Sequence, residues 1–133
     1  MSEENFEVVM ETFRRFRPGD LEEWAAMFEP EAVVTPPDGW PEPGPFVGRE
    51  ALIRQWERLF ADWAEFRFEN FEVAAESDEW VVFTFRMHAR GETSGLDADF
   101  DFAVASRIRD GLTAESHFRW ELDDAIEAAG LSE

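Results

Sequence analysis

Three residue types are missing from this sequence of 133 residues: it contains no Cys, no Tyr and no Lys. Without Cys, the chain cannot form disulfides, zinc-thiolate sites or a cysteine nucleophile. Without Tyr, the rings of its 14 Phe and 6 Trp residues carry no phenolic hydroxyl. These absences exclude thiol chemistry and every mechanism that needs a Tyr hydroxyl as a hydrogen-bond donor.

Positive charge is also scarce. The acidic residues number 31 against 12 basic residues, all of them Arg, and the formal net charge is −19. A field of this sign repels the phosphates of nucleic acids and of anionic membrane surfaces. We therefore expect neither a nucleic acid nor a membrane among the partners of this protein.

The sequence contains no long apolar run either. A helix needs about 20 consecutive apolar residues to cross a bilayer, and no segment approaches that length. Residues 1–16 are polar and amphipathic, unlike a secretory signal peptide. We expect a soluble, cytoplasmic protein whose residues 1–133 form one domain with a substantial core.

Apolar residues recur at helical spacing in three segments of the first half of the chain. These segments are residues 5–17, 21–28 and 49–63. Asp20, followed by Glu23 three positions later, is a candidate N-cap for the second helix. Residues 32–35 predict a brief strand, and the five prolines and three glycines of residues 36–48 forbid regular structure.

After residue 63 the apolar residues alternate as they do in a strand. The predicted strands are residues 66–76, 80–90, 96–108 and 113–121, and a short helix at 123–130 follows. Helices that precede a meander of long strands predict an α+β domain. We expect a cone-shaped roll, in which three N-terminal helices pack on a strongly bent antiparallel sheet and a short C-terminal helix ends the chain.

The two middle strands of this meander match best in one register. The facing pairs would be Arg86 and Asp101, His88 and Asp99, Arg90 and Asp97, Met87 and Phe100, Phe85 and Phe102, and Phe83 and Val104. Charged residues then share one face and apolar residues the other. In the last hairpin the equivalent match places Ser106 opposite Ser116, Val104 beside Phe118 and Phe102 beside Trp120. The aromatic face should lie toward the helices.

Asp97, Asp99 and Asp101 superficially resemble the start of a calcium-binding loop. Such a loop needs a Gly at its sixth position, which is Phe102 here. Along a strand, carboxylates two positions apart lie roughly 7 Å from each other, too far for three of them to share one ion easily. We interpret them as a solvent-facing row paired with basic residues, and we expect no metal and no cofactor.

The charged face also contains a milder patch of small and aromatic side chains. Its members are Trp80, Val82, Thr84, Ala103, Ala105 and His117. A Trp beside small side chains on a charged sheet is typical of a surface that another subunit covers. This patch, called the outer patch below, predicts a homodimer through the outer face of the sheet.

The order of the predicted elements, the segment GREALIRQWERLF after a Pro-rich loop, and RIRDG before the last strand resemble the SnoaL-like branch of the nuclear transport factor 2-like superfamily. The resemblance covers nearly the whole chain and is more specific for the fold than for an activity. It implies a cone of helices and bent sheet around a pocket, and a dimer through the outer sheet face. Members include ketosteroid isomerase, polyketide cyclases and limonene epoxide hydrolase, so the fold alone does not choose a function.

The catalytic residues that this resemblance implies are replaced at the matching positions. The isomerase base corresponds to Pro36, and the oxyanion-hole acid of the isomerases corresponds to a position near Val104. The second oxyanion donor would be a Tyr, which the chain lacks. The acid/base Asp of the cyclases corresponds to Phe118. Without a base and two donors, neither reaction is expected.

A small apolar molecule is the ligand that the remaining residues favour, because ligand pockets have mostly apolar walls with a few polar groups. The residues expected to line the pocket are Trp40, Trp56, Phe85, Phe100, Phe102, Val104, Ser106, Ser116, Phe118 and Trp120. Two alternatives remain. The rings could fill the cone of a catalytically silent dimerisation or accessory domain. Alternatively, Asp38 or His117 could be the base of an isomerase, cyclase or hydratase.

Both candidate bases also have a simpler interpretation. Asp38 precedes a Gly in a Pro-rich turn, where Asp is a common turn former. His117 faces outward in the register above and reaches the pocket only if the last strand slips by one residue. Three polar residues border the apolar helix faces, Glu11, Arg14 and Gln55, and we expect them to face solvent.

Overall fold

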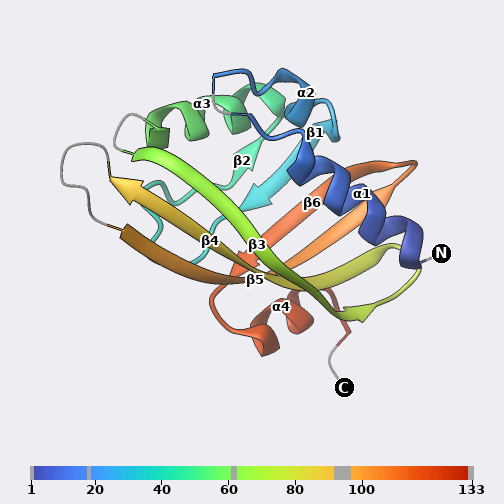
Figure 1. Cartoon of the computed structure of the whole chain (residues 1–133). Helices are drawn as coiled ribbons and strands as arrows, with labels where there is room; N and C mark the ends of the chain where they lie inside the picture. The colour runs from blue at the N-terminus through green and yellow to red at the C-terminus, as the bar shows by residue number, and fades with distance from the viewer. Residues whose placement is uncertain (1, 18, 61–62, 92–96, 132–133) are drawn as a thin grey trace.

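The computed structural model describes residues 2–17, 19–60, 63–91 and 97–131. Over these ranges the elements are α1 (Ser2–Arg14), α2 (Glu22–Ala25), β1 (Phe28–Thr35), β2 (Phe46–Val47), α3 (Arg49–Phe60), β3 (Trp63–Glu76), β4 (Trp80–Gly91), β5 (Asp97–Arg109), β6 (Leu112–Arg119) and α4 (Leu122–Ala128). Figure 1 shows the strands curving beneath α1 and α3. The α+β class predicted from the sequence is confirmed. None of the described helices is long and apolar enough to cross a membrane.

The sheet is mixed, which corrects the expectation of a wholly antiparallel one. Its strand order is β2-β1-β6-β5-β4-β3, and β1 pairs with β6 in parallel, for example Val33 with Glu115 and Thr35 with His117. These two strands are joined by most of the chain. Such a long-range pairing leaves no signal in local periodicity, because a parallel pair needs a crossover connection rather than a turn.

The registers predicted for the two long hairpins are confirmed. Every expected pair between β4 and β5 is present, from Arg90 opposite Asp97 to Phe83 opposite Val104. Between β5 and β6, Val104 lies opposite Phe118 and Ser106 opposite Ser116. The register then shifts after Arg107, next to a turn in which Asp110 and Gly111 both have positive φ angles of 51° and 78°. The alternation of apolar and polar residues in the two strands does not indicate that irregularity.

Several elements differ from the prediction, and the Pro-rich segment expected to lack regular structure contains the short strand β2 at Phe46–Val47. The second helix is a single turn, Glu22–Ala25, and Leu21 rather than Asp20 is its N-cap, without a side-chain hydrogen bond. The chain extends from Phe28 onward as β1, so the predicted strand 32–35 is only its second half. α3 ends at Phe60 and β3 already begins at Trp63. The predicted strand start at residue 96 lies outside the described residues.

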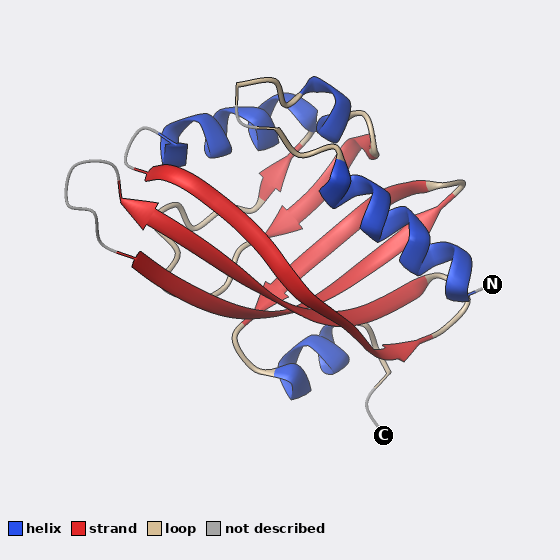
Figure 2. Ribbon diagram, viewed as in Figure 1, coloured by secondary structure: helices blue, strands red, loops and turns tan. Residues whose placement is uncertain are grey.

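The main core lies between the concave face of the sheet and the helices α1 and α3 (Figure 2). Phe83 and Val104 are 1 % exposed and Leu52 is 1 % exposed, so each of the layers contributes fully buried side chains. Phe85 is the centre of this core, because its ring lies 5.0 Å from that of Phe13 and 5.3 Å from that of Phe102. The aromatic face of the sheet therefore points toward the helices, as predicted.

The convex face carries the predicted row of charge pairs. Arg86 donates to Asp101 at 2.8 Å, Arg90 donates to Asp97 at 3.2 Å, and Nδ1 of His88 lies 2.6 Å from Asp99. The hydrogen bond from Arg86 lowers the pKa of Asp101 below its usual value. Within the described parts of the chain no group of three His, Asp or Glu side chains is arranged to hold a metal ion.

The outer patch was expected to be available to a second subunit, but α4 of the same chain packs on its centre. Figure 2 shows this helix on the side of the sheet opposite α1 and α3. Val82, Ala103 and Ala105 are at most 2 % exposed and form a cluster with Ala125 and Ala129 of the same chain. Small side chains on both surfaces allow this close approach. Only the margin of the patch, at Trp80, Thr84 and His117, stays partly exposed, so the homodimer stays a prediction.

Candidate functional site

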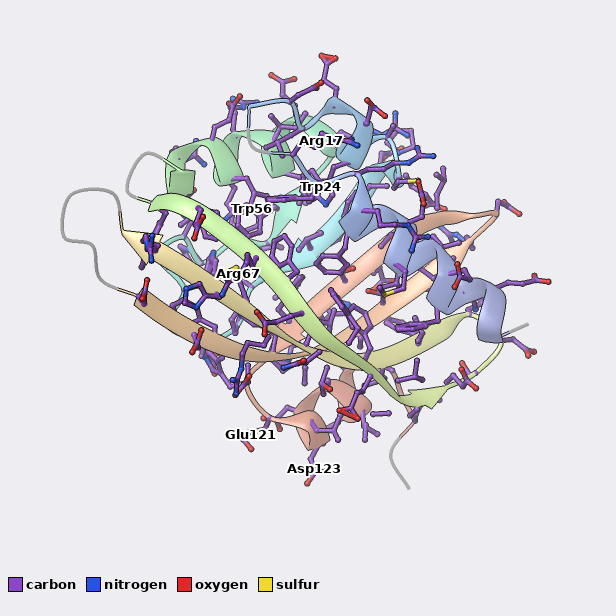
Figure 3. The ribbon with its side chains drawn as sticks, viewed as in Figure 1. Arg17, Trp24, Trp56, Arg67, Glu121 and Asp123 are labelled. Atoms are coloured by element: carbon purple, nitrogen blue, oxygen red, sulfur yellow. The ribbon has the colours of Figure 1, made fainter. Side chains whose placement is uncertain are left out.

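A cavity of about 80 Å³ lies between α1, α2 and α3 on one side and the sheet on the other. The Pro-rich segment also contributes to the wall through Pro36, Pro37 and Trp40. Figure 3 labels Trp24 of α2 and Trp56 of α3, whose side chains lie between these helices and the sheet. The wall consists mainly of Phe, Trp and aliphatic side chains, so the space is mostly apolar.

The aromatic wall follows from the alternation of the strands. In β4 and β5, Phe83, Phe85, Phe102 and Val104 occupy every second position, and all four line the cavity. Trp40 closes over Phe102, with ring centroids 5.8 Å apart in an edge-to-face arrangement. Aromatic pairs prefer this geometry and offset stacking, which holds the rings of the wall in defined positions.

Eight of the ten residues expected to line a ligand pocket lie in the wall of this cavity, and their role in ligand binding stays a prediction. They are Trp40, Trp56, Phe85, Phe102, Val104, Ser106, Ser116 and Phe118. Phe100 and Trp120 are the exceptions. Trp120 is 41 % exposed and stacks on the back of Phe102 at 5.1 Å, and its indole N–H donates to the backbone carbonyl of Asp38 at 2.8 Å. β6 ends at Arg119, so Trp120 lies outside the strand that places Phe118 in the wall.

Five polar side chains interrupt the apolar wall: Thr12, Gln55, Ser106, Thr113 and Ser116. The hydroxyl of Thr12 donates to the carbonyl of Val8 at 2.7 Å. The hydroxyls of Ser106 and Ser116 lie 2.8 Å apart and bond to each other, as their opposed positions in the sheet predict.

Gln55 and Thr113 line the cavity but were not predicted from the sequence to do so. Gln55 was expected to face solvent, but its side chain lines the cavity and the residue is only 4 % exposed. It lies three positions after the buried Leu52 and directly before Trp56, so the helix turns it toward the interior. This spacing from Leu52 and Trp56 is the sequence feature that could have indicated an inward-facing Gln55. Glu11 and Arg14 do lie on the outside of α1, where Nε of Arg14 is 3.0 Å from Glu11.

Neither candidate base reaches the cavity. Asp38 is exposed and lies in a separate polar groove beside Arg119, Asp124 and Glu127. His117 is on the outer face, where Nε2 is 3.0 Å from Glu115 and the ring stacks on Trp80 at 6.1 Å. No acidic or basic side chain lines the cavity among the residues that the structure describes. Pro36, Val104 and Phe118, at the positions where the resemblance implied catalytic residues, all lie in the wall.

The hydrogen bonds around Glu115 make a testable contribution to stability. Hydrogen bonds from His117 and then from Arg107 lower the pKa of Glu115 below 4.5. A carboxylate whose pKa is lowered by folding stabilises the protein above the unfolded pKa, and this contribution is lost as the pH falls through the folded value. We expect Glu115→Gln to lower the Tm by about 3 °C at pH 7 and to have little effect near pH 3.

Thermal unfolding at the two pH values measures this difference. Glu127→Gln on the exposed side of α4 is a suitable control, because it removes a carboxylate without changing a described ion pair. An equal loss of Tm at both pH values would show that Glu115 acts through packing rather than through its charge.

Comparison with known proteins identifies the fold. A family model described as the SnoaL-like domain matches residues 9–116. The chain belongs to the SnoaL-like family. Among solved structures, it is similar to a nuclear transport factor 2-like protein of unknown function from Burkholderia pseudomallei K96243. The two are 24 % identical, with a TM-score of 0.77 over 96 % of this chain and 97 % of the other.

Two further solved structures with a similar fold have more informative names. A provisionally assigned polyketide cyclase from Xanthomonas campestris pv. campestris is 16 % identical, with a TM-score of 0.75 over 96 % of this chain and 98 % of the other. TerC, co-crystallised with polyporic acid, is 19 % identical, with a TM-score of 0.76 over 93 % and 98 %. At these identities the likeness establishes the fold alone. No protein of curated function matches the chain by sequence.

Proposed function

We propose that this SnoaL-like protein binds a small, mainly apolar molecule in the cavity between its helices and its sheet. The observation that carries this proposal is a wall of aromatic and aliphatic side chains without an acidic or basic group among the described residues. Such a wall favours burial of apolar surface and supplies no group for proton transfer. The co-crystal of TerC with polyporic acid supports the proposal, because it is a ligand complex on the same fold.

The size of the cavity limits what it can hold. A volume of about 80 Å³ is smaller than the engineered cavity of about 150 Å³ that binds benzene, and far below the roughly 300–1,000 Å³ of pockets for drug-sized ligands. The present arrangement therefore suits a compact molecule. A larger ligand would have to displace a side chain of the wall, and Trp40 stands on a segment without regular structure.

The same volume favours a second candidate function, a catalytically silent accessory domain whose own rings fill the cone. Protein interiors are close-packed, and small cavities also occur in proteins without a ligand. The two candidates differ in one measurable respect. A binding site admits an apolar molecule of matching size at a defined position, whereas an interior filled by its own rings excludes it.

Catalysis by Asp38 or His117 has less support. A general base must come within hydrogen-bond reach of the proton that it removes. Both residues lie outside the cavity, and the ring nitrogens of His117 already have partners in Thr35 and Glu115. Under this proposal the protein binds its ligand without acid–base chemistry from Asp38 or His117.

Titration with methylenecyclopentane, an uncharged hydrocarbon about as large as benzene that enters by displacing a wall side chain such as Trp40, tests the binding proposal. We expect saturable binding with a Kd of about 1 mM, because affinity is limited by the small number of atoms in such a ligand. Chemical-shift changes in a protein NMR spectrum should centre on Phe85, Val104 and Phe118, which line the cavity.

Val104→Phe is the matched cavity-filling variant. It places a ring where Val104 is 1 % exposed, and we expect binding to be lost while the variant still unfolds cooperatively. An exposed substitution, Val73→Phe on β3, should leave the affinity unchanged. If methylenecyclopentane fails to saturate the unchanged protein, the accessory-domain alternative is favoured instead.

A further inference from the structure

Gln55 is a buried polar side chain in the wall of the cavity. The residue is 4 % exposed and lines the cavity, and no hydrogen bond from its amide to another described residue is present. Fully covered side-chain nitrogen or oxygen atoms without a partner are absent from the described residues. The amide atoms of Gln55 therefore keep a little accessible surface of their own, and the cavity is the space beside them.

An unused amide at this position has an energetic cost. Burying a polar group without a hydrogen bond costs about 1–3 kcal/mol in proteins, and an apolar side chain of similar shape would avoid that cost. Leu52, one turn earlier on the same face of α3, shows that an aliphatic residue fits this layer. The amide is thus better explained by a partner that enters the cavity than by packing.

The Ser106–Ser116 pair supplies a second unused donor. Two hydroxyl groups carry two protons, and the single bond of 2.8 Å between them uses one. The other proton is free to reach a neighbouring acceptor. Thr113, which is 3 % exposed, adds another hydroxyl without a side-chain hydrogen bond in the described structure. The wall therefore offers several donors to an oxygen atom inside the cavity.

We propose that the ligand is a neutral molecule with a carbonyl or hydroxyl oxygen, and that Gln55 is the residue that recognises this oxygen. This inference rests on the binding function proposed above and specifies its ligand class. The described wall contains no charged side chain, so a carboxylate or an ammonium group would be buried without a counter-ion, which is strongly unfavourable. Neutral ketones, lactones and alcohols remain as the chemical class that fits.

Two pairs of probes separate this proposal from general apolar binding. Cyclopentanone and methylenecyclopentane have nearly the same shape and differ in the exocyclic oxygen. We expect cyclopentanone to bind the unchanged protein about tenfold more tightly, as one buried hydrogen bond allows. Isobutyrate and cyclopentylamine, which are charged near neutral pH, should not bind measurably.

Gln55→Met removes the amide and keeps an unbranched apolar side chain of similar length. In this variant cyclopentanone should bind more weakly than methylenecyclopentane, because its oxygen would be buried without the amide as a partner, while the affinity for the hydrocarbon is retained or improved. Glu57→Met changes an exposed side chain of the same helix and should preserve the tenfold preference. Ser116→Ala should reduce that preference only partly.

The outcomes distinguish the two proposals. If neither probe binds the unchanged protein, the binding function itself fails. If methylenecyclopentane binds but cyclopentanone has no advantage, or if Gln55→Met keeps the advantage, the cavity is an apolar site and the role of Gln55 is refuted. Retained binding of the hydrocarbon to Gln55→Met excludes misfolding as the cause of a lost preference.

Discussion

Phe85→Ala is expected to destabilise the protein by about 4 kcal/mol, because it removes the ring at the centre of the aromatic core. Phe85 is 3 % exposed, and its ring contacts residues of α1, β3, β5 and β6. The nearest approach is to Phe13, at 5.0 Å between ring centroids. Since a domain of this kind has a total stability of about 5–15 kcal/mol, one substitution removes a large fraction of it.

Urea unfolding with parallel fluorescence and circular dichroism measures this loss. Val73→Ala is the control, because Val73 is 40 % exposed at the edge strand β3 and should change the free energy of unfolding by about 0.5 kcal/mol or less. A loss below about 1 kcal/mol for Phe85→Ala would mean that the ring is not tightly packed.

The same variant also tests whether an enlarged cavity admits a ligand. Phe85 lines the cavity, so its removal joins the space of the lost ring to the existing 80 Å³. Benzene should then bind the variant and recover part of its stability, because a ligand that binds only the folded state stabilises it by mass action. Collapse of the wall into the new space would instead leave benzene without effect.

The sequence predicted those parts of the fold in which two independent patterns agree. The register of β4 and β5 is an example: placing Arg86 opposite Asp101 satisfies the charged face and also pairs Phe85 with Phe102 on the apolar face. A shift by one residue violates both faces at once. The Ser106–Ser116 hydrogen bond follows from the same argument applied to β5 and β6.

Features that depend on distant contacts were not predictable in this way. The parallel pairing of β1 with β6 joins segments separated by more than half of the chain, and neither strand carries a local sign of the other. The volume of the cavity depends on how side-chain rings pack against each other. Composition shows that many rings are present, but not whether they meet at the centre.

Gln55 and α4 were misinterpreted for different reasons. A polar residue at the border of an apolar helix face usually points to solvent. Gln55 instead lies on the same side of α3 as Leu52 and Trp56, and its side chain lines the cavity. The small residues of the outer patch do indicate a covered surface, but the sequence does not show which surface covers it. The helix that supplies Ala125 and Ala129 was itself predicted, and its packing on the patch was the missing step.

Ala125→Arg is expected to detach α4 from the sheet and to destabilise the protein by about 3 kcal/mol. Ala125 is 0 % exposed and packs on Val82, Ala103 and Ala105. These close contacts leave no room for a longer side chain, and a buried guanidinium would lack a partner there. Glu127→Arg on the exposed side of the same helix introduces the same charge and should have little effect.

Detachment of α4 has a second consequence that sedimentation velocity can measure. It exposes the apolar centre of the outer patch, and a contiguous exposed apolar surface favours association. Ala125→Arg should therefore self-associate in a concentration-dependent manner, whereas the additional change Trp80→Arg should reverse this by placing a charge at the margin of the same surface. If Ala125→Arg is as stable as the unchanged protein and shows the same sedimentation, α4 does not cover the patch in solution, and the outer face is available to a second copy as the sequence predicted.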